Sequence, residues 1–120
     1  MADIHFFGDG EAPKPREEVK IEQLETVVYP DRFRVFIHIA VTPFMERPNV
    51  LLTARSAENK IVSELSVIET MHNDMEFTMH LRNLQEPAGE YTLTADLYYE
   101  TRNPPQDRKV ITFVVPEATE

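Results

Sequence analysis

The sequence has no cysteine and no tryptophan, and only three of its 120 residues are glycine. Without cysteine, the chain forms no disulfide and has no thiolate to serve as nucleophile or metal ligand. Gly8, Gly10 and Gly89 are too few to build a glycine-rich loop around a phosphate. No serine lies in a Gly-x-Ser-x-Gly motif, a common setting of a hydrolase nucleophile. We therefore expect a protein that is not an enzyme and that binds no cofactor.

Positive charge is also scarce in this chain. Twelve Lys and Arg residues stand against 21 Asp and Glu residues, which gives a net charge of −9. Nucleic acid and anionic membranes would repel such a chain, so neither is an expected partner. No apolar run approaches the roughly 20 residues that span a bilayer. The first residues lack the basic and apolar regions of a secretory signal, and this favours a cytoplasmic location, as does the lack of cysteine.

The chain does contain hydrophobic alternation with a period of two. Its 42% hydrophobic and 28% charged residues are typical of one globular domain. From Tyr91 to Tyr99 apolar residues occupy every second position, which predicts a strand with one buried face. The same kind of pattern predicts further strands at 19–27, 33–41, 50–55, 61–70, 74–82 and 108–115. Turn signals separate these strands at intervals of about 8 to 12 residues, as in β-sandwiches.

The predicted strands define one domain at 17–116, between a flexible N-terminal tail at 1–16 and a C-terminal tail at 117–120. A phase shift near Gln23 indicates either a β-bulge or a first strand that switches sheets. Within the N-terminal tail, the apolar cluster at 4–7 either contacts the domain or serves as a docking motif that adds a strand to a sheet edge. The expected core residues are Val35, Ile37, Ile39, Leu52, Leu65, Phe77, Met79, Leu81, Tyr91, Leu93, Leu97 and Phe113.

A tyrosine at the start of the penultimate strand supports a comparison of this chain with a particular type of β-sandwich. In the stretch 87–93, Tyr91 follows a glycine turn and precedes a buried position, Leu93, by two residues. This arrangement resembles the tyrosine corner of immunoglobulin-like sandwiches. Together with the final strand, it resembles the end of bacterial immunoglobulin-like and fibronectin type III-like domains. The resemblance implies an immunoglobulin-like antiparallel β-sandwich of about seven strands. It also implies a role in adhesion, spacing or partner docking. The missing cysteine pair and tryptophan separate the chain from antibody domains.

The titratable residues form no recognisable site in the sequence. The four histidines are His5, His38, His72 and His80, and none are spaced as the His-x-His or His-x-x-x-His pairs that bind metals. The predicted strands place His38 and His80 on solvent-facing sides of neighbouring strands. Most carboxylates also fall at outward strand positions. We therefore predict neither a metal site nor catalytic residues.

A partner-binding surface is expected at one end of the sandwich. The loops at 42–49, 70–73 and 101–106 follow the second, fourth and sixth strands, so they should emerge together. They contain the aromatic, Met and Arg residues that interfaces favour. The expected partner-binding residues are Phe44, Met45, Glu46, Arg47, Met71, His72, Arg102 and Asn103.

These observations predict a non-catalytic protein-interaction module whose partner is another protein. The oligomeric state is left open. The alternative function is that of a small-ligand or carbohydrate-binding sandwich, for which Phe44 and Tyr98 would be the aromatic platforms. A structural alternative concerns Phe44 and Met45, whose side chains could instead fold down and cap the end of the core.

Overall fold

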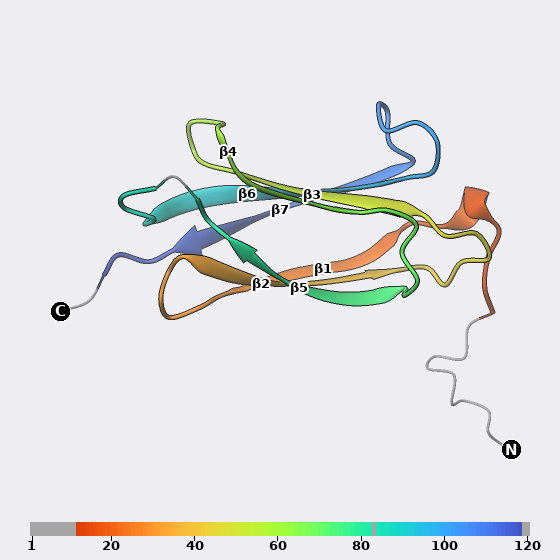
Figure 1. The fold of residues 1–120 in the computed structure, drawn as a ribbon, viewed down its shortest axis with the longest axis horizontal. Coiled ribbons are helices and arrows are strands. Elements are labelled where there is room, and N and C mark those ends of the chain that lie inside the picture. Colours follow the sequence, from red (N-terminus) through yellow and green to blue (C-terminus); the bar gives the residue numbers. More distant parts are fainter. Residues whose placement is uncertain (1–11, 83, 119–120) are drawn as a thin grey trace, which may run out of the picture.

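The computed structural model describes residues 12–82 and 84–118, which contain seven β-strands (Figure 1). The strands are β1 (Ile21–Val28), β2 (Arg34–Val41), β3 (Asn49–Arg55), β4 (Ile61–Val67), β5 (Asp74–His80), β6 (Gly89–Tyr98) and β7 (Asp107–Val115). A short 3-10 helix, Arg16–Glu18, precedes β1. Within these residues, no helix is both long enough and apolar enough to cross a membrane.

The strands form two antiparallel sheets that pack face to face (Figure 1). The three-stranded sheet has the order β1-β2-β5, and the four-stranded sheet has the order β4-β3-β6-β7. This arrangement confirms the predicted immunoglobulin-like β-sandwich. In immunoglobulin constant domains the fourth strand pairs with the fifth, whereas β4 here pairs with β3. Consequently β1 lies beside β7 along one side of the sandwich, and β4 lies beside β5 along the other.

Side-chain alternation along the strands builds the core between the sheets. Val35, Ile37, Ile39 and Val41 on β2 point inward and are fully buried, while the residues between them lie on the outer face. Burial confirms the expected core positions Val35, Ile37, Ile39, Leu52, Met79, Leu81, Tyr91, Leu93, Leu97 and Phe113.

The expectation that Leu65 and Phe77 are core residues is wrong, because both are only half-buried. Leu65 lies on β4 and Phe77 on β5, and each of these strands is at the edge of its sheet. Alternation predicts the direction in which a side chain points. It does not predict whether the opposite sheet extends far enough to cover that side chain.

The phase shift near Gln23 is a β-bulge. In the pairing of β1 with β2, the register shifts between Ile21, opposite Val41, and Gln23, opposite Ala40. The whole of β1 remains in the three-stranded sheet, so the sheet-switching alternative is not realised.

Residues near the end of the expected N-terminal tail contact the domain. The N–H of Lys14 donates to the carbonyl oxygen of Pro43 at 2.9 Å, and the N–H of Met45 donates to that of Lys14 at 3.0 Å. This short parallel pairing joins Lys14 to Phe44. The apolar cluster at 4–7 lies outside the described residues.

Tyr91 forms the expected corner between the β5–β6 loop and β6. Its hydroxyl donates a hydrogen bond to the carbonyl oxygen of Pro87 at 2.6 Å, as in a tyrosine corner. The ring stacks on Phe113 of β7, with 5.3 Å between ring centroids. Burial raises the pKa of the Tyr91 hydroxyl, which keeps it protonated as the donor.

The fourth strand is shorter than the predicted range of 61–70 and ends at Val67. Glu69 has a φ of 49°, so the backbone turns away from the extended conformation there. The segment at 68–73 therefore leaves the sheet and crosses to β5 as a loop (Figure 1).

Candidate functional site

The loops at 42–49, 70–73 and 101–106 lie at the same end of the sandwich (Figure 1). This was predicted from their positions after the second, fourth and sixth strands along the chain. The helix Arg16–Glu18 lies at this end as well. We call this end of the molecule the loop end. The loop arrangement brings the expected partner-binding residues to one end, and their role in binding stays a prediction.

Asn49 ties the loops of the loop end together. Its Nδ2 donates to the carbonyl oxygen of Tyr99 at 2.8 Å, and its Oδ1 accepts a hydrogen bond from the N–H of Glu69 at 2.8 Å. Beside it, the N–H of Thr70 donates to the carbonyl oxygen of Pro48 at 2.9 Å. Because Asn49 is buried, these hydrogen bonds satisfy amide groups that would otherwise be costly to bury.

Arg16 makes a second set of contacts between the loops. Its guanidinium hydrogen-bonds to the Glu46 carboxylate, with 3.1 Å between Nε and Oε1, and lies 3.5 Å from Oε2 of Glu100. The same group stacks over the ring of Tyr99 at 4.6 Å. The hydrogen bond to Glu46 raises the pKa of Arg16. Of the expected binding residues, Glu46 is therefore already engaged within the chain.

Phe44 and Met45 differ in their surroundings. Phe44 is half-buried and packs against the core. The side chain of Met45, by contrast, is 71% exposed. The core-capping alternative therefore applies to Phe44, while Met45 is accessible to a partner.

An apolar groove lies at the loop end between β4 and β5, and we call it the β4–β5 groove. It has a volume of about 480 Å³, and its lining includes Arg47, Val67, Ile68, Met71, His72 and Phe77. Ile68 and Met71 are 65% and 68% exposed. The structure thus brings together three expected residues, Arg47, Met71 and His72. Sequence reasoning missed Ile68, because its position was assigned to the fourth strand.

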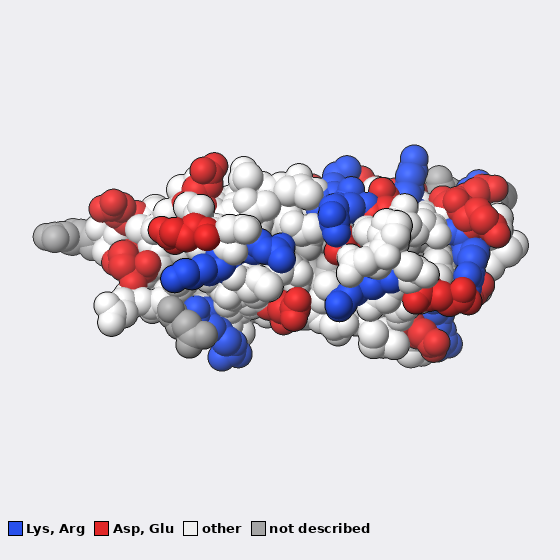
Figure 2. All heavy atoms as spheres, turned by 90° about the horizontal axis from the view of Figure 1, so that it is seen from above, with Lys and Arg blue, Asp and Glu red and all other residues white. Residues whose placement is uncertain are grey.

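Arg102 and Asn103 do not line this groove and lie instead beside the outer face of the four-stranded sheet, the face that Figure 2 shows. They border a hollow of about 360 Å³ together with Arg55 of β3 and Arg108 of β7. Two hydrogen bonds join Arg108 to Asp96, at 2.6 Å from Nε to Oδ1 and 3.2 Å from Nη2 to Oδ2. These bonds raise the pKa of Arg108. We call this feature the arginine-lined hollow.

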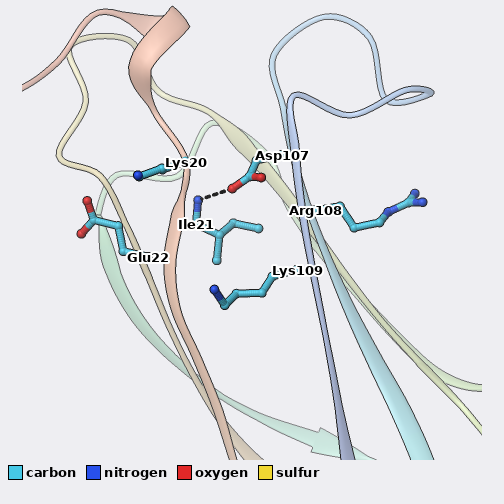
Figure 3. Close-up of a pocket in the computed structure, with 6 residues that line it drawn as sticks. All are labelled: Lys20, Ile21, Glu22, Asp107, Arg108 and Lys109. Carbon is cyan, nitrogen blue, oxygen red and sulfur yellow. Dashed lines mark hydrogen bonds between the residues drawn. The ribbon is translucent and has the colours of Figure 1, made fainter.

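Another hollow lies between the edges of β1 and β7 (Figure 3). There, Oδ2 of Asp107 accepts a hydrogen bond from the N–H of Ile21 at 2.8 Å. Lys109 extends into the gap, whereas Arg108 points away from it (Figure 3). Charged side chains thus occupy the junction of the two sheet edges, where Asp107 satisfies the N–H of Ile21 and Lys109 extends into the gap. Nothing in this arrangement indicates a ligand.

His38 lies on the outer face of the three-stranded sheet between two carboxylates. Its Nε2 is 2.7 Å from Oδ1 of Asp74, and its Nδ1 is 3.4 Å from Oε1 of Glu25. The hydrogen bond to Asp74 raises the pKa of His38. His80 is exposed on the neighbouring strand β5, as predicted. Across residues 12–82 and 84–118, no group of three or more His, Cys, Asp or Glu residues is placed to hold a metal ion.

The comparisons with known proteins support the fold alone. No protein-family model and no curated protein matches the sequence. Solved structures similar to this chain include a glycosyl hydrolase family 2 member from Bacteroides cellulosilyticus DSM 14838, at 13% identity and a TM-score of 0.57. That match covers 81% of this chain and 15% of the other chain. A structure of such a family member from microfluidic crystals, also from Bacteroides cellulosilyticus, matches at 13% identity and a TM-score of 0.53, covering 81% and 14% of the two chains. This chain therefore shares its fold with a small β-sandwich portion of much longer proteins.

Proposed function

We propose that this chain is a non-catalytic module that binds a polypeptide partner in the β4–β5 groove. The observation that carries the proposal is the exposure of Ile68 and Met71, which are 65% and 68% exposed beside the groove. Large apolar side chains gathered on a surface mark interaction sites more often than isolated ones do. Methionine is also enriched at interfaces, because its unbranched side chain adapts to irregular partners.

The strands that border the groove each have an unpaired edge. Among the described residues, β4 pairs with β3 alone and β5 pairs with β2 alone. Such an edge presents N–H and C=O groups to which an extended segment can add as a further strand. The alternate side chains of that segment would contact Val67 and Phe77, which line the groove. We therefore assign the groove to an extended polypeptide.

Charge favours a partner segment that contains basic residues. The chain has a net charge of −9, and the charged residues Glu69 and Arg47 in the lining of the groove offset each other. Asp74 and Glu76 are exposed on the outer face of β5, and they alternate with Met75 and Phe77, which line the groove. An apolar segment flanked by Lys or Arg would be attracted to this surface and oriented by it.

A random-peptide library displayed on phage tests the proposal. We expect the domain to enrich peptides that combine apolar and basic residues. The double variant Ile68→Ser/Met71→Ser should bind the selected peptides at least tenfold more weakly, because apolar anchors dominate such interfaces. Val110→Ser is the matched control, since Val110 is an apolar residue of β7 that is 53% exposed and lies outside the groove. Failure to enrich any peptide, or unchanged binding by the double variant, would contradict the proposal.

Phe44, one of the expected partner-binding residues, is a poor probe of binding, because its ring packs against the core and its loss would change stability. The alternative function, binding of a small ligand, is favoured by a different surface. That surface is the arginine-lined hollow on the four-stranded sheet.

A further inference from the structure

The arginine-lined hollow has a floor that is more buried than is usual for the outer face of a sheet. Leu51, Thr53 and Asp96 alternate with inward residues and so point outward, yet they are 9%, 6% and 7% exposed. The loop between β6 and β7, which carries Arg102 and Asn103, rises beside this face (Figure 1). At about 360 Å³ the hollow is within the size range of small-molecule sites.

The hollow concentrates positive charge in an acidic protein. Arg55, Arg102 and Arg108 line it, against two carboxylates, Asp96 and Glu64. Arg108 neutralises Asp96 through the bidentate contact. In the part of the chain that the structure describes, Arg55 and Arg102 form no ion pair. Figure 2 shows Lys and Arg side chains across the middle of this face, with most of the acidic side chains toward its two ends.

We propose that the arginine-lined hollow binds a small carboxylate that also carries several hydroxyl groups, of the sugar-acid class. A guanidinium presents paired N–H donors that match the two oxygens of a carboxylate. Arg55 and Arg102 are the cations that contact this carboxylate. Arg108 does not contact the ligand, because its guanidinium is already bound to Asp96, and its role is to position the Asp96 carboxylate in the floor of the hollow.

The uncharged lining suits the rest of such a ligand. Thr53, Thr94 and Asn103 provide both donors and acceptors for hydroxyl groups, and Leu51 and Val110 provide apolar surface for ring carbon atoms. The hollow and the β4–β5 groove share no lining residue. The proposal therefore does not depend on the polypeptide partner.

Titration of the ¹⁵N-labelled protein with D-glucuronate, followed by NMR, tests this inference. D-Glucose is the matched control ligand, since it carries a hydroxymethyl group in place of the carboxylate. We expect glucuronate to shift the amide resonances of Thr53, Thr94 and Asn103 in a saturable manner, and glucose to leave them unchanged. Acetate at equal ionic strength supplies a carboxylate without hydroxyls and should bind at least tenfold more weakly.

Two variants test the roles of the arginines. Arg55→Gln and Arg102→Gln should each weaken glucuronate binding about tenfold, as expected for loss of one charge-assisted hydrogen bond. Arg82→Gln is the matched control, because Arg82 is exposed after β5 and does not line the hollow. Equal thermal unfolding midpoints would show that the variants remain folded. No saturable shift with glucuronate, equal shifts with glucose, equal affinity for acetate, or full binding by both hollow variants would each overturn the proposal.

Discussion

His38 of β2 and Asp74 of β5 are joined by a contact of 2.7 Å between Nε2 and Oδ1. Glu25 of β1 approaches the other ring nitrogen, so one imidazole connects all three strands of the smaller sheet. The cation is favoured in the folded state because both neighbours are carboxylates, and the pKa of His38 is raised above its ordinary value of 6.5. This contact therefore links the stability of the sheet to pH.

We expect the stabilisation by His38 to be fully present below about pH 6.5 and to be lost as the pH rises through the raised pKa of the folded state. The difference in unfolding free energy between wild type and His38→Gln should accordingly shrink from about pH 6 to pH 8. Urea denaturation at several pH values measures it. His80→Gln is the control, because exposed His80 makes no ion pair with the described residues. Parallel pH profiles for wild type and His38→Gln would contradict this prediction.

Removal of the Tyr91 hydroxyl should destabilise the fold. Tyr91→Phe deletes the donor to the Pro87 carbonyl and retains the ring that stacks on Phe113. We expect a loss of about 1 kcal/mol in the free energy of unfolding, the usual net contribution of one hydrogen bond. Tyr98→Phe is the control, because the Tyr98 hydroxyl has no hydrogen-bond partner among residues 12–82 and 84–118. Similar unfolding midpoints for the two variants would argue against a stabilising corner.

The loss of stability caused by truncating a side chain on β5 should depend more on how deeply the residue is buried than on the size of its side chain. Met79 is 2% exposed, and Met79→Ala should cost about 2 to 5 kcal/mol. Phe77 is larger but only half-buried at the sheet edge, so Phe77→Ala should cost less than the roughly 3 to 5 kcal/mol of a fully buried phenylalanine. Chemical denaturation of both variants measures their losses of unfolding free energy and shows which loss is larger. A greater loss for Phe77→Ala would show that the β4–β5 side is better packed than its exposure indicates.

Asn49 should be the most sensitive polar residue of the loop end. Asn49→Ala leaves the carbonyl oxygen of Tyr99 and the N–H of Glu69 without their partner, which should cost about 2 kcal/mol. Hydrogen exchange should also become faster in the loop at 68–73, because its link to β3 is lost. Asn103→Ala, at an exposed loop position, is the matched control and should change neither measurement. Unchanged exchange in Asn49→Ala would mean that other contacts hold the loop.

The alternation of apolar residues was sufficient to predict the strands and most of the core, because side-chain direction is a local property of an extended backbone. Strand order then placed the three loops at one end. The environment of each loop residue depended on contacts between distant residues, such as Arg16 with Glu46 and Asn49 with Tyr99. No local pattern specifies such pairs. For the same reason, Arg102 could be assigned to the correct end but not to the face on which it lies.

The position of β7 at the edge of its sheet has a consequence for aggregation. The segment 110–115 contains no charge, proline or glycine, and its Val110 and Val114 are 53% and 62% exposed. Such a segment can template pairing with identical strands of other molecules. Lys109 precedes it and Pro116 follows it, at the positions where charge or proline stops strand growth. Lys109→Val should therefore increase light scattering at high protein concentration, whereas Lys60→Val, in the β3–β4 turn, should not. Resistance of this acidic protein to self-association thus rests on a few residues beside one strand as well as on its net charge.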